Sequence, residues 1–463
     1  MEIFSEMLRL LLFAGSLIIL GASVLLSFKT RFIQIRMLPQ MFKMLIFSIF
    51  KKGKEGKGLV RPHKALFTAM STTIGISTIV APIIAIQLGG PGAMLGFILA
   101  TMLGAAVNFT EVTFALRYRK KEKNGMFSGG PMQYLHDEIA PFLAKIYACC
   151  LFVLMMVWSA AQANQLAELL NSPMLGSFRI PNMFTGLAIA FLAIAVLMGG
   201  IKRVASLSTK LVPVMFCLFV SASLYIVCCN LEKLPAIFQL IWSSAFTPKA
   251  MGGGTAVGGL MMALRWGIFK GIHSSEAGVG TQTIPHSMAD TQSSVNQGIL
   301  GMLATFSACF LCVLSGLVAL VTEPWLDQSL SLGINMVTRS YQLYFSYIGV
   351  IVIVVSAILF AFGTIVGNGF NGSQCFTYLS KGKFIKSYYF ATAGIIFLGT
   401  IADVAFVWSN VDLVLVPAVL INTLAIVYLS YKRGDFLSTE LALPSSESSK
   451  ESLLKTQVLN NKV

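Results

Sequence analysis

Charged residues are scarce in this chain, and their scarcity excludes most soluble folds. Asp, Glu, Lys and Arg make up 11% of the 463 residues, whereas soluble domains carry about 25%. Hydrophobic residues make up 56%, and the mean hydropathy is +0.77. The apolar runs have the length of helices and lack the alternation over ~10 residues that is typical of a transmembrane barrel. The sequence therefore predicts an all-α polytopic membrane protein.

The motifs of enzymes and metal centres are also missing. No Ser/His/Asp order and no phosphate-binding loop stands out. The eight cysteines, which include the adjacent pairs Cys149-Cys150 and Cys228-Cys229, lack the spacing of metal ligands. We therefore expect neither an enzyme nor a cofactor other than a coupling ion. The net charge of +15 is explained by basic loops between apolar segments, so no nucleic-acid partner is expected.

Apolar segments long enough to cross a bilayer recur along the chain. A crossing needs roughly 20 apolar residues, and we predict eleven spans. They lie near residues 8–28, 63–88, 91–118, 141–168, 183–200, 204–229, 253–282, 296–322, 344–377, 386–406 and 410–431. The basic segment 29–62 mixes bulky apolar and charged residues, which predicts an amphipathic helix in the cytoplasmic interface. The polar tail 437–463 is predicted to be disordered and cytoplasmic.

Lysine and arginine gather in alternate loops, which predicts the orientation of the chain. The basic clusters are segment 29–62, segment 117–123, Lys202-Arg203, and Lys381 with Lys383 and Lys386. All of them fall on one side if the N-terminus is outside and the C-terminus is cytoplasmic. We therefore expect an integral protein of the cell (inner) membrane in that orientation, in contact with membrane lipid.

Two of the predicted spans are interrupted by small and polar residues. Span 253–282 contains the run from Gly271 to Gly280, and span 63–88 contains the run from Thr72 to Thr78. Glycine and serine at this density weaken a helix. For one cluster alone, close helix packing would be the favoured explanation. Interrupted spans at matching places in two halves of a chain instead predict the binding site of a secondary transporter.

Two glutamates lie inside predicted spans, where a carboxylate is costly unless it has a partner or a function. Glu276 follows Arg265 and Lys270. It is either a proton or cation relay or, as we favour, a structural partner of a neighbouring base or backbone N–H. Glu111 precedes the basic run 117–123 and is expected to form a local ion pair.

Further polar residues lie in two other apolar spans. Thr364 and Asn368 are four residues apart in span 344–377, so they share one face of a helix. Gln162 and Asn164 lie near the end of span 141–168. These side chains are predicted to line a polar path and not to face lipid.

Four motifs resemble those of the alanine or glycine:cation symporters (sodium:alanine symporters). They are Gly89-Gly90-Pro91-Gly92-Ala93, Gly129-Gly130-Pro131-Met132-Gln133-Tyr134-Leu135, Ser275-Glu276-Ala277-Gly278-Val279-Gly280 and Gln297-Gly298. The resemblance implies the five-plus-five inverted repeat of the amino acid–polyamine–organocation superfamily, which is leucine-transporter-like. The repeats would occupy 63–230 and 253–431, with one extra transmembrane helix in residues 1–28.

The same resemblance implies a function and a site. Members of the family import alanine or glycine with sodium, sometimes with protons, so the implied substrate is a small neutral amino acid. Carried over by motif, the substrate would lie beside Thr73, Gly75, Ile76, Ser77, Gln162, Asn164, Ser274, Thr364 and Asn368. Thr364 would also be a ligand of the sodium ion.

The chain departs from the family's motifs at this implied site. Gly75-Ile76-Ser77-Thr78-Ile79 stands where the family usually has Gly-Thr-Gly-Asn-Ile, and Ser275 replaces an asparagine. Gly363-Thr364 replaces a Ser-Thr pair, and Asn368 replaces a tryptophan. The lost hydroxyl at Gly363 removes an oxygen ligand from a sodium site. A proton-coupled or weakly coupled amino acid exchanger is therefore the alternative function, whereas a channel is disfavoured because no selectivity ring is visible.

The predicted orientation can be tested at the two ends of the chain. A reporter fused after Phe436 should be cytoplasmic, and a tag inserted at Glu2 should be accessible from outside intact cells. The physical reason is that the basic loops stay on the cytoplasmic side during insertion. Protease or antibody accessibility of the two tags measures this, and both ends on the same side would contradict the eleven-span topology.

Overall fold

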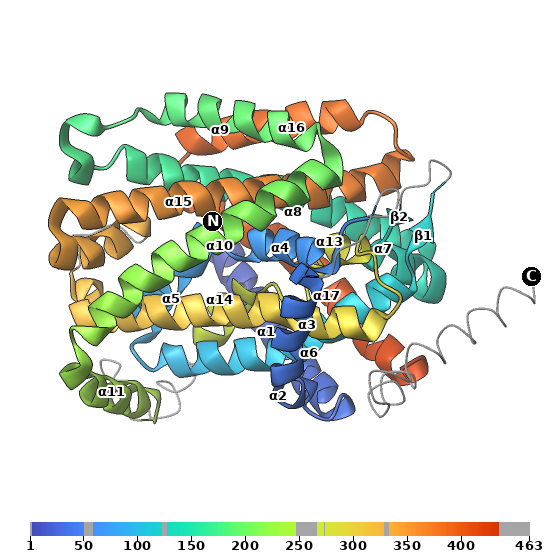
Figure 1. Cartoon of the computed structure of the whole chain (residues 1–463), viewed down its shortest axis with the longest axis horizontal. Helices are drawn as coiled ribbons and strands as arrows, with labels where there is room; N and C mark the ends of the chain where they lie inside the picture. Colours follow the sequence, from blue (N-terminus) through green and yellow to red (C-terminus); the bar gives the residue numbers. More distant parts are fainter. Residues whose placement is uncertain are drawn as a thin grey trace, which may run out of the picture.

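The computed structural model of the protein describes residues 2–50, 59–122, 127–246, 266–272, 274–327 and 333–434. Within these residues the structure is built almost entirely of helices. The elements α8, α14 and α15 run along the long axis of the molecule, with the strands β1 and β2 near one end and α11 near the other (Figure 1). The buried side chains form one extended hydrophobic core between the helices.

The N-terminal half contains eleven α-helices in the described segments. They are α1 (Glu2–Lys29), α2 (Ile33–Arg36), α3 (Leu38–Phe50), α4 (Pro62–Thr73), α5 (Ile76–Gly89), α6 (Ala93–Arg117), α7 (Pro131–Tyr134), α8 (Pro141–Leu170), α9 (Asn182–Leu197), α10 (Gly200–Cys228) and α11 (Leu234–Phe246). Pro62 and Pro141 begin α4 and α8, where the missing N–H of proline leaves no hydrogen bond unmade. Two short antiparallel strands, β1 (Lys120–Lys121) and β2 (Phe127–Ser128), form a hairpin in the basic loop and are a small exception to the predicted all-α class.

The C-terminal half continues with five labelled helices. They are α13 (Thr283–Ser287), α14 (Ser294–Thr322), α15 (Ile334–Ser380), α16 (Ile385–Ile401) and α17 (Val404–Lys432). The hydroxyl of Ser293 caps α14 by accepting a hydrogen bond from the N–H of Asn296 at 3.1 Å. The chain therefore starts this long helix with a side chain that satisfies one of its free N–H groups.

The helices follow the predicted spans where the structure describes them. By length and apolar composition, six of the described helices could cross a membrane, or seven if the bent pair α4 and α5 is one span. Shorter apolar helices lie in the predicted spans near 8–28, 183–200 and 386–406. The predicted span 253–282 is described only from residue 266, and the predicted disordered tail lies outside the described residues.

A span is predicted near 344–377, and the helix that contains it starts earlier in the structure. The element α15 has 47 residues and begins at Ile334, but Ser346 has φ 49° and ψ −132°, which is not helical. Two helices therefore meet at this residue, and only the second corresponds to the predicted span. An isolated positive φ at a non-glycine residue carries little signal in the sequence.

The two basic segments 29–62 and 117–123 meet the loop before α14 at the end of the molecule that carries β1 and β2 (Figure 1). The guanidinium of Arg119 donates hydrogen bonds to the carbonyls of Ser287, Ala289 and Thr291 at 3.1, 2.7 and 3.1 Å. The N–H of Val60 donates to the carbonyl of Met288 at 3.0 Å. The loops that precede α4, follow α6 and precede α14 are thereby joined, as expected if they share one side of the membrane.

The carboxyl end of α17 reaches the same place. Arg433 donates to the carboxylate of Glu138 at 3.3 Å, and the hydroxyl of Tyr118 donates to it at 2.8 Å. Desolvation raises the pKa of the Glu138 carboxyl, but the hydrogen bonds from Tyr118 and Arg433 and the charges of Arg433 and Lys432 outweigh it. The pKa of Glu138 therefore lies below its ordinary value, and the ion pair links the end of the last helix to the helical turn Leu135–Ile139, which follows α7.

Candidate functional site

The chain between α4 and α5 breaks inside the molecule, and the two helices meet at an angle of 43°. The N–H of Gly75 donates to Thr78 Oγ1 at 3.1 Å, and the N–H of Ile76 donates to Gln162 Oε1 at 2.9 Å. In a continuous helix these groups would donate to the carbonyls of Ser71 and Thr72. The break therefore frees two carbonyl oxygens at the end of α4 and exposes the amino end of α5.

Two side chains from other helices contact this break. A β-carbon at Gly75 would lie 2.7 Å from Thr364 Oγ1 and 2.9 Å from Gln162 Oε1. The Thr364 hydroxyl donates to the carbonyl of Ile74 at 3.3 Å, and the Gln162 amide donates to Ser77 Oγ at 3.3 Å. Only glycine at position 75 permits this approach.

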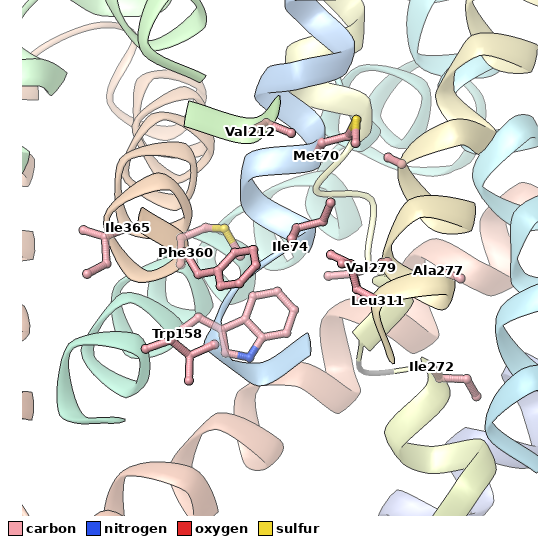
Figure 2. Close-up of a cluster of buried hydrophobic side chains, with 14 of the residues drawn as sticks. Met70, Ile74, Trp158, Val212, Ile272, Ala277, Val279, Leu311, Phe360 and Ile365 are labelled. Atoms are coloured by element: carbon pink, nitrogen blue, oxygen red, sulfur yellow. The ribbon is translucent and has the colours of Figure 1, made fainter. Parts of the chain in front are cut away.

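Five of the predicted site residues therefore meet at one point: Gly75, Ile76, Ser77, Gln162 and Thr364. They come from the break, from α8 and from α15. Ile74 at the break belongs to a buried hydrophobic cluster that includes Trp158 and Phe360 (Figure 2). The polar groups at the break thus lie in mostly apolar surroundings. The low local dielectric there strengthens each of their hydrogen bonds.

The second predicted interruption is also present in the described residues. After the helical residues 266–272, the backbone turns through Glu276, Gly278 and Gly280, which have φ of 54°, 83° and 87°. The Glu276 carboxylate accepts hydrogen bonds from the hydroxyls of Thr72 at 3.4 Å and Thr281. The first break and the second break are therefore in direct contact through Glu276.

The partners of Glu276 differ from those expected. Glu276 is 5% exposed, and in the described part of the chain its partners are hydroxyl groups and no cation. Lys270, one of the two expected bases, lies over the ring of Phe269, and Arg265 lies outside the described residues. A base was the natural expectation because buried charges are usually paired.

The other predicted site residues have different surroundings. The Thr73 hydroxyl donates to the carbonyl of Ala69 at 3.1 Å and lies beside Glu276, and Ser274 is buried at 2% exposure beside Cys312. Asn368 is fully buried on α15. These three lie near one break or the other, but in the described part of the chain no hydrogen bond joins them to Gly75, Gln162 or Thr364.

Asn164 does not join the group around Gly75. Its amide donates to the carbonyls of Gly399 and Ala402, at 2.8 and 3.0 Å, where α16 ends. It lines a cavity of about 240 Å³ near the carboxyl end of α8, together with Glu168, Asn171 and Asn335 among others. Two residues along a helix turn the side chain through about 200°, so Gln162 and Asn164 face different neighbours.

The prediction that Glu111 forms a local ion pair is wrong. Glu111 is 1% exposed, and it accepts hydrogen bonds from the Asn422 amide of α17 at 2.6 Å and from the N–H of Gly278. Asn422 also donates to the carbonyl of Gly278 at 2.9 Å and accepts from the Tyr134 hydroxyl. Asn422 is not among the predicted site residues, although an asparagine in the apolar span 410–431 is a signal for such a contact.

Comparison with known proteins identifies the family. The profile described as the sodium:alanine symporter family matches residues 2–439, which is nearly the whole chain. The chain belongs to the sodium:alanine symporter family. The resemblance found in the motifs is thereby confirmed, and the family consists of transporters and not of enzymes.

Individual relatives agree with this assignment. An uncharacterized transporter of Haemophilus influenzae is 35% identical over 397 residues, which cover 85% of this chain and 86% of that protein. The sodium/alanine symporter AgcS of Methanococcus maripaludis is 30% identical over 404 residues, covering 85% and 87%. The family and the relatives together identify this symporter as an integral membrane protein that carries an amino acid with a cation.

The fold has counterparts among solved transporters. A crystal structure of a manganese transporter of Eremococcus coleocola superimposes with a TM-score of 0.55 and covers 88% of this chain and 93% of that chain. The two sequences are 12% identical, so the likeness concerns the fold alone. The described part of this symporter therefore shares a nearly all-helical fold with that protein.

The close approach at Gly75 predicts the effect of a single methyl group. Gly75→Ala should lower amino acid uptake by roughly tenfold or more, because its β-carbon would displace Thr364 and Gln162 from the break. Gly75→Leu should abolish uptake, with membrane abundance near normal in both variants. Gly21→Ala is the matched control, since a β-carbon there meets nothing within 4 Å. Normal uptake by Gly75→Leu would remove this break from the transport site.

Proposed function

We propose that the protein imports a small neutral amino acid of the alanine or glycine class together with sodium, by alternating access. The observation that supports this most strongly is the meeting of Gly75, Gln162 and Thr364 at a break inside the membrane. Such breaks present backbone N–H groups to anionic parts of a substrate and carbonyls to a cation. Both kinds of group are available within a few residues of Gly75.

The substrate carboxylate is proposed to bind at the amino end of α5. The N–H of Ile76 donates to Gln162 Oε1, an oxygen that a carboxylate could replace. The positive end of the helix dipole favours an anion at this place. Thr73, Ser77, Ser274 and the amide Nδ2 of Asn368 are proposed to lie around the rest of the substrate, and Gln162 is proposed to turn away from Ile76 and contact the substrate. Asn164 is proposed to act farther along the path, at the cavity near the end of α8.

The sodium ion is proposed to bind between α4 and α15. Thr364 would supply its hydroxyl, and the carbonyls of Ser71 and Thr72 are freed of their helical donors by the break. Sodium is a hard cation that prefers oxygen ligands, as the hard divalent cations do. A β-carbon at Gly363 would meet Ser71 Cβ at 3.8 Å and Met215 Sδ at 4.0 Å, so one further small side chain fits beside this site.

The architecture proposed for this activity is the five-plus-five inverted repeat with eleven spans. The repeats would cover 63–230 and 253–431, with the two breaks in their first helices. The N-terminus would be outside and the C-terminus inside the cell membrane. Val60 and Arg119 both contact the loop near Met288. These contacts support the proposal that the basic segments 29–62 and 117–123 lie on the same side of the membrane.

One observation favours a second candidate, a proton-coupled or weakly coupled amino acid exchanger. Glycine at position 363 provides no hydroxyl beside Thr364, although the structure has room for one. A sodium site with fewer oxygen ligands binds the ion more weakly. Uptake of labelled alanine and glycine into proteoliposomes, with sodium and proton gradients imposed separately, distinguishes the two candidates.

In that assay, alanine uptake should follow the sodium gradient, and two substitutions should move its sodium dependence in opposite directions. Thr364→Ala should lower the apparent sodium affinity, because it removes a hydroxyl ligand. Gly363→Ser should raise this affinity by about threefold to tenfold, since one added polar contact contributes ~1 kcal/mol. Thr392→Ala is a matched control, because among the described residues this buried threonine bonds within α16 alone, to the carbonyl of Tyr388.

The opposite results would contradict this proposal. Uptake driven by the proton gradient alone would favour the exchanger. Strong sodium coupling that is unchanged in Thr364→Ala would place the coupling ion elsewhere in the protein.

A further inference from the structure

Glu276 is a buried carboxylate for which the proposed substrate and sodium sites provide no role. Its neighbours in the described part of the chain are the hydroxyls of Thr72, Thr73 and Thr281. An ionised carboxylate at membrane depth is strongly disfavoured without a positive counter-charge. Hydroxyl groups donate hydrogen bonds to the carboxylate but leave its charge in place.

Two asparagines on α15 also have unsatisfied polar atoms. Asn371 donates to the carbonyl of Thr281 at 3.1 Å, but its Oδ1 has no hydrogen-bond partner among the described residues. Neither Oδ1 nor Nδ2 of Asn368 has one there either, and both asparagines are completely buried. Buried amides are normally satisfied, so such atoms call for an explanation.

The helix geometry places these amides on a face of α15 that contacts residues of both breaks. Thr364, Asn368 and Asn371 follow one another at spacings of four and three residues, so they lie along one face of α15. At one end of this face Thr364 bonds to Ile74, and at the other Asn371 bonds to Thr281, the partner of Glu276.

Asn368 lies between those two contacts. The preceding residue, Gly367, packs directly against Thr72, another partner of Glu276. The unsatisfied amides therefore lie on the part of α15 that contacts the partners of Glu276 in α4 and in the second break.

We propose that this region is a second sodium site, formed by Glu276, Thr72, Thr281, Asn368 and Asn371. The inference rests on the proposed sodium-coupled transport and assigns a second coupling ion to it. One carboxylate, two hydroxyls and two amide oxygens make the oxygen-rich surroundings that a hard cation prefers. A bound sodium ion neutralises the carboxylate and satisfies the amide oxygens. A proton on Glu276 would also neutralise the carboxylate, but it would leave the Oδ1 of Asn368 without a partner.

The location gives the second ion a role in coupling. Thr72 belongs to the helix before the first break, whereas Glu276 and Thr281 belong to the second. An ion bound by all three holds the two breaks together and stabilises the arrangement in which they touch. Such differential binding is what a ligand needs to shift a conformational equilibrium.

The test is equilibrium binding of ²²Na⁺ to the purified full-length protein in detergent. The wild-type protein should bind about two ions per chain, and Glu276→Gln and Asn368→Leu should each bind about one. Thr364→Ala should also bind about one, and Glu276→Gln combined with Thr364→Ala should bind none. The Asn368→Leu variant carries the argument if Glu276→Gln misfolds, because it replaces an unsatisfied amide with an apolar group of similar size.

Glu111→Gln is the matched control for loss of a buried carboxylate. Glu111 has its own donors in Asn422 and Gly278, so this variant should keep both ions. Gel filtration and thermal unfolding show which variants are folded before binding is compared.

Two outcomes would overturn the second site. One is a wild-type protein that binds a single ion, which is lost in Thr364→Ala and kept in Glu276→Gln. The other is unchanged sodium binding in Glu276→Gln with a changed pH dependence of uptake, which would make Glu276 a proton site. Sodium binding needs no amino acid here, so two bound ions without alanine or glycine uptake would refute the proposed substrate and leave the second site standing.

Discussion

The structure depends on one constraint, which is that backbone N–H and C=O groups inside a membrane need partners within the protein. The break between α4 and α5 violates the helical pattern at Ile74 and Gly75. Gln162 and Thr78 accept hydrogen bonds from the freed N–H groups, and Thr364 donates to the carbonyl of Ile74. These hydrogen bonds satisfy the freed backbone groups, and they also hold the side chains from α5, α8 and α15 in place around the break. Groups that satisfy a break can also be replaced there by a ligand.

The second break extends this arrangement through a charge. Glu276 adopts a positive φ and reaches the hydroxyl of Thr72 at the end of α4, so the two breaks are coupled directly. Glu111 contacts the same turn from α6, through the N–H of Gly278 and the amide of Asn422. Two buried carboxylates thus adjoin one short segment of backbone. Alternating access requires such segments to have two arrangements. A buried charge interacts strongly with its surroundings because the local dielectric is low, so the two arrangements differ widely in electrostatic free energy.

Much of the fold and part of the site could be predicted from the sequence. The scarcity of charge and the apolar runs predicted membrane helices, and the small polar clusters predicted both breaks, since few residue types tolerate such backbone. Gly75, Gln162 and Thr364 were found by motif and proved to meet. The position of Asn164 could not be predicted as well. Which neighbour a residue of α8 faces depends on how that helix is rotated and shifted against the helices around it, and the sequence does not give this. Glu111 was misjudged for a related reason, because its nearest charges in sequence are not its neighbours in space.

Other features depend on contacts between distant parts of the chain. The partners of Asn422 come from α6, α7 and the second break, and no local pattern in the sequence predicts that combination. The kink at Ser346 is accompanied only by Gly349, where a β-carbon would collide with the backbone of Tyr341, and one glycine in an apolar span is a weak signal for a kink. Asn371 was within a motif rich in glycine and asparagine, but its bond to Thr281 became apparent only when α15 was placed beside the second break.

The central claim is that the break at Gly75 holds the transported amino acid. The most direct measurement is an experimental structure of the protein with alanine and sodium bound. We expect density for the amino acid against the backbone of Gly75 to Ser77, with its carboxylate at the N–H of Ile76 in place of Gln162 Oε1. Amino acid density elsewhere, with the bond from Ile76 to Gln162 intact, would contradict the claim.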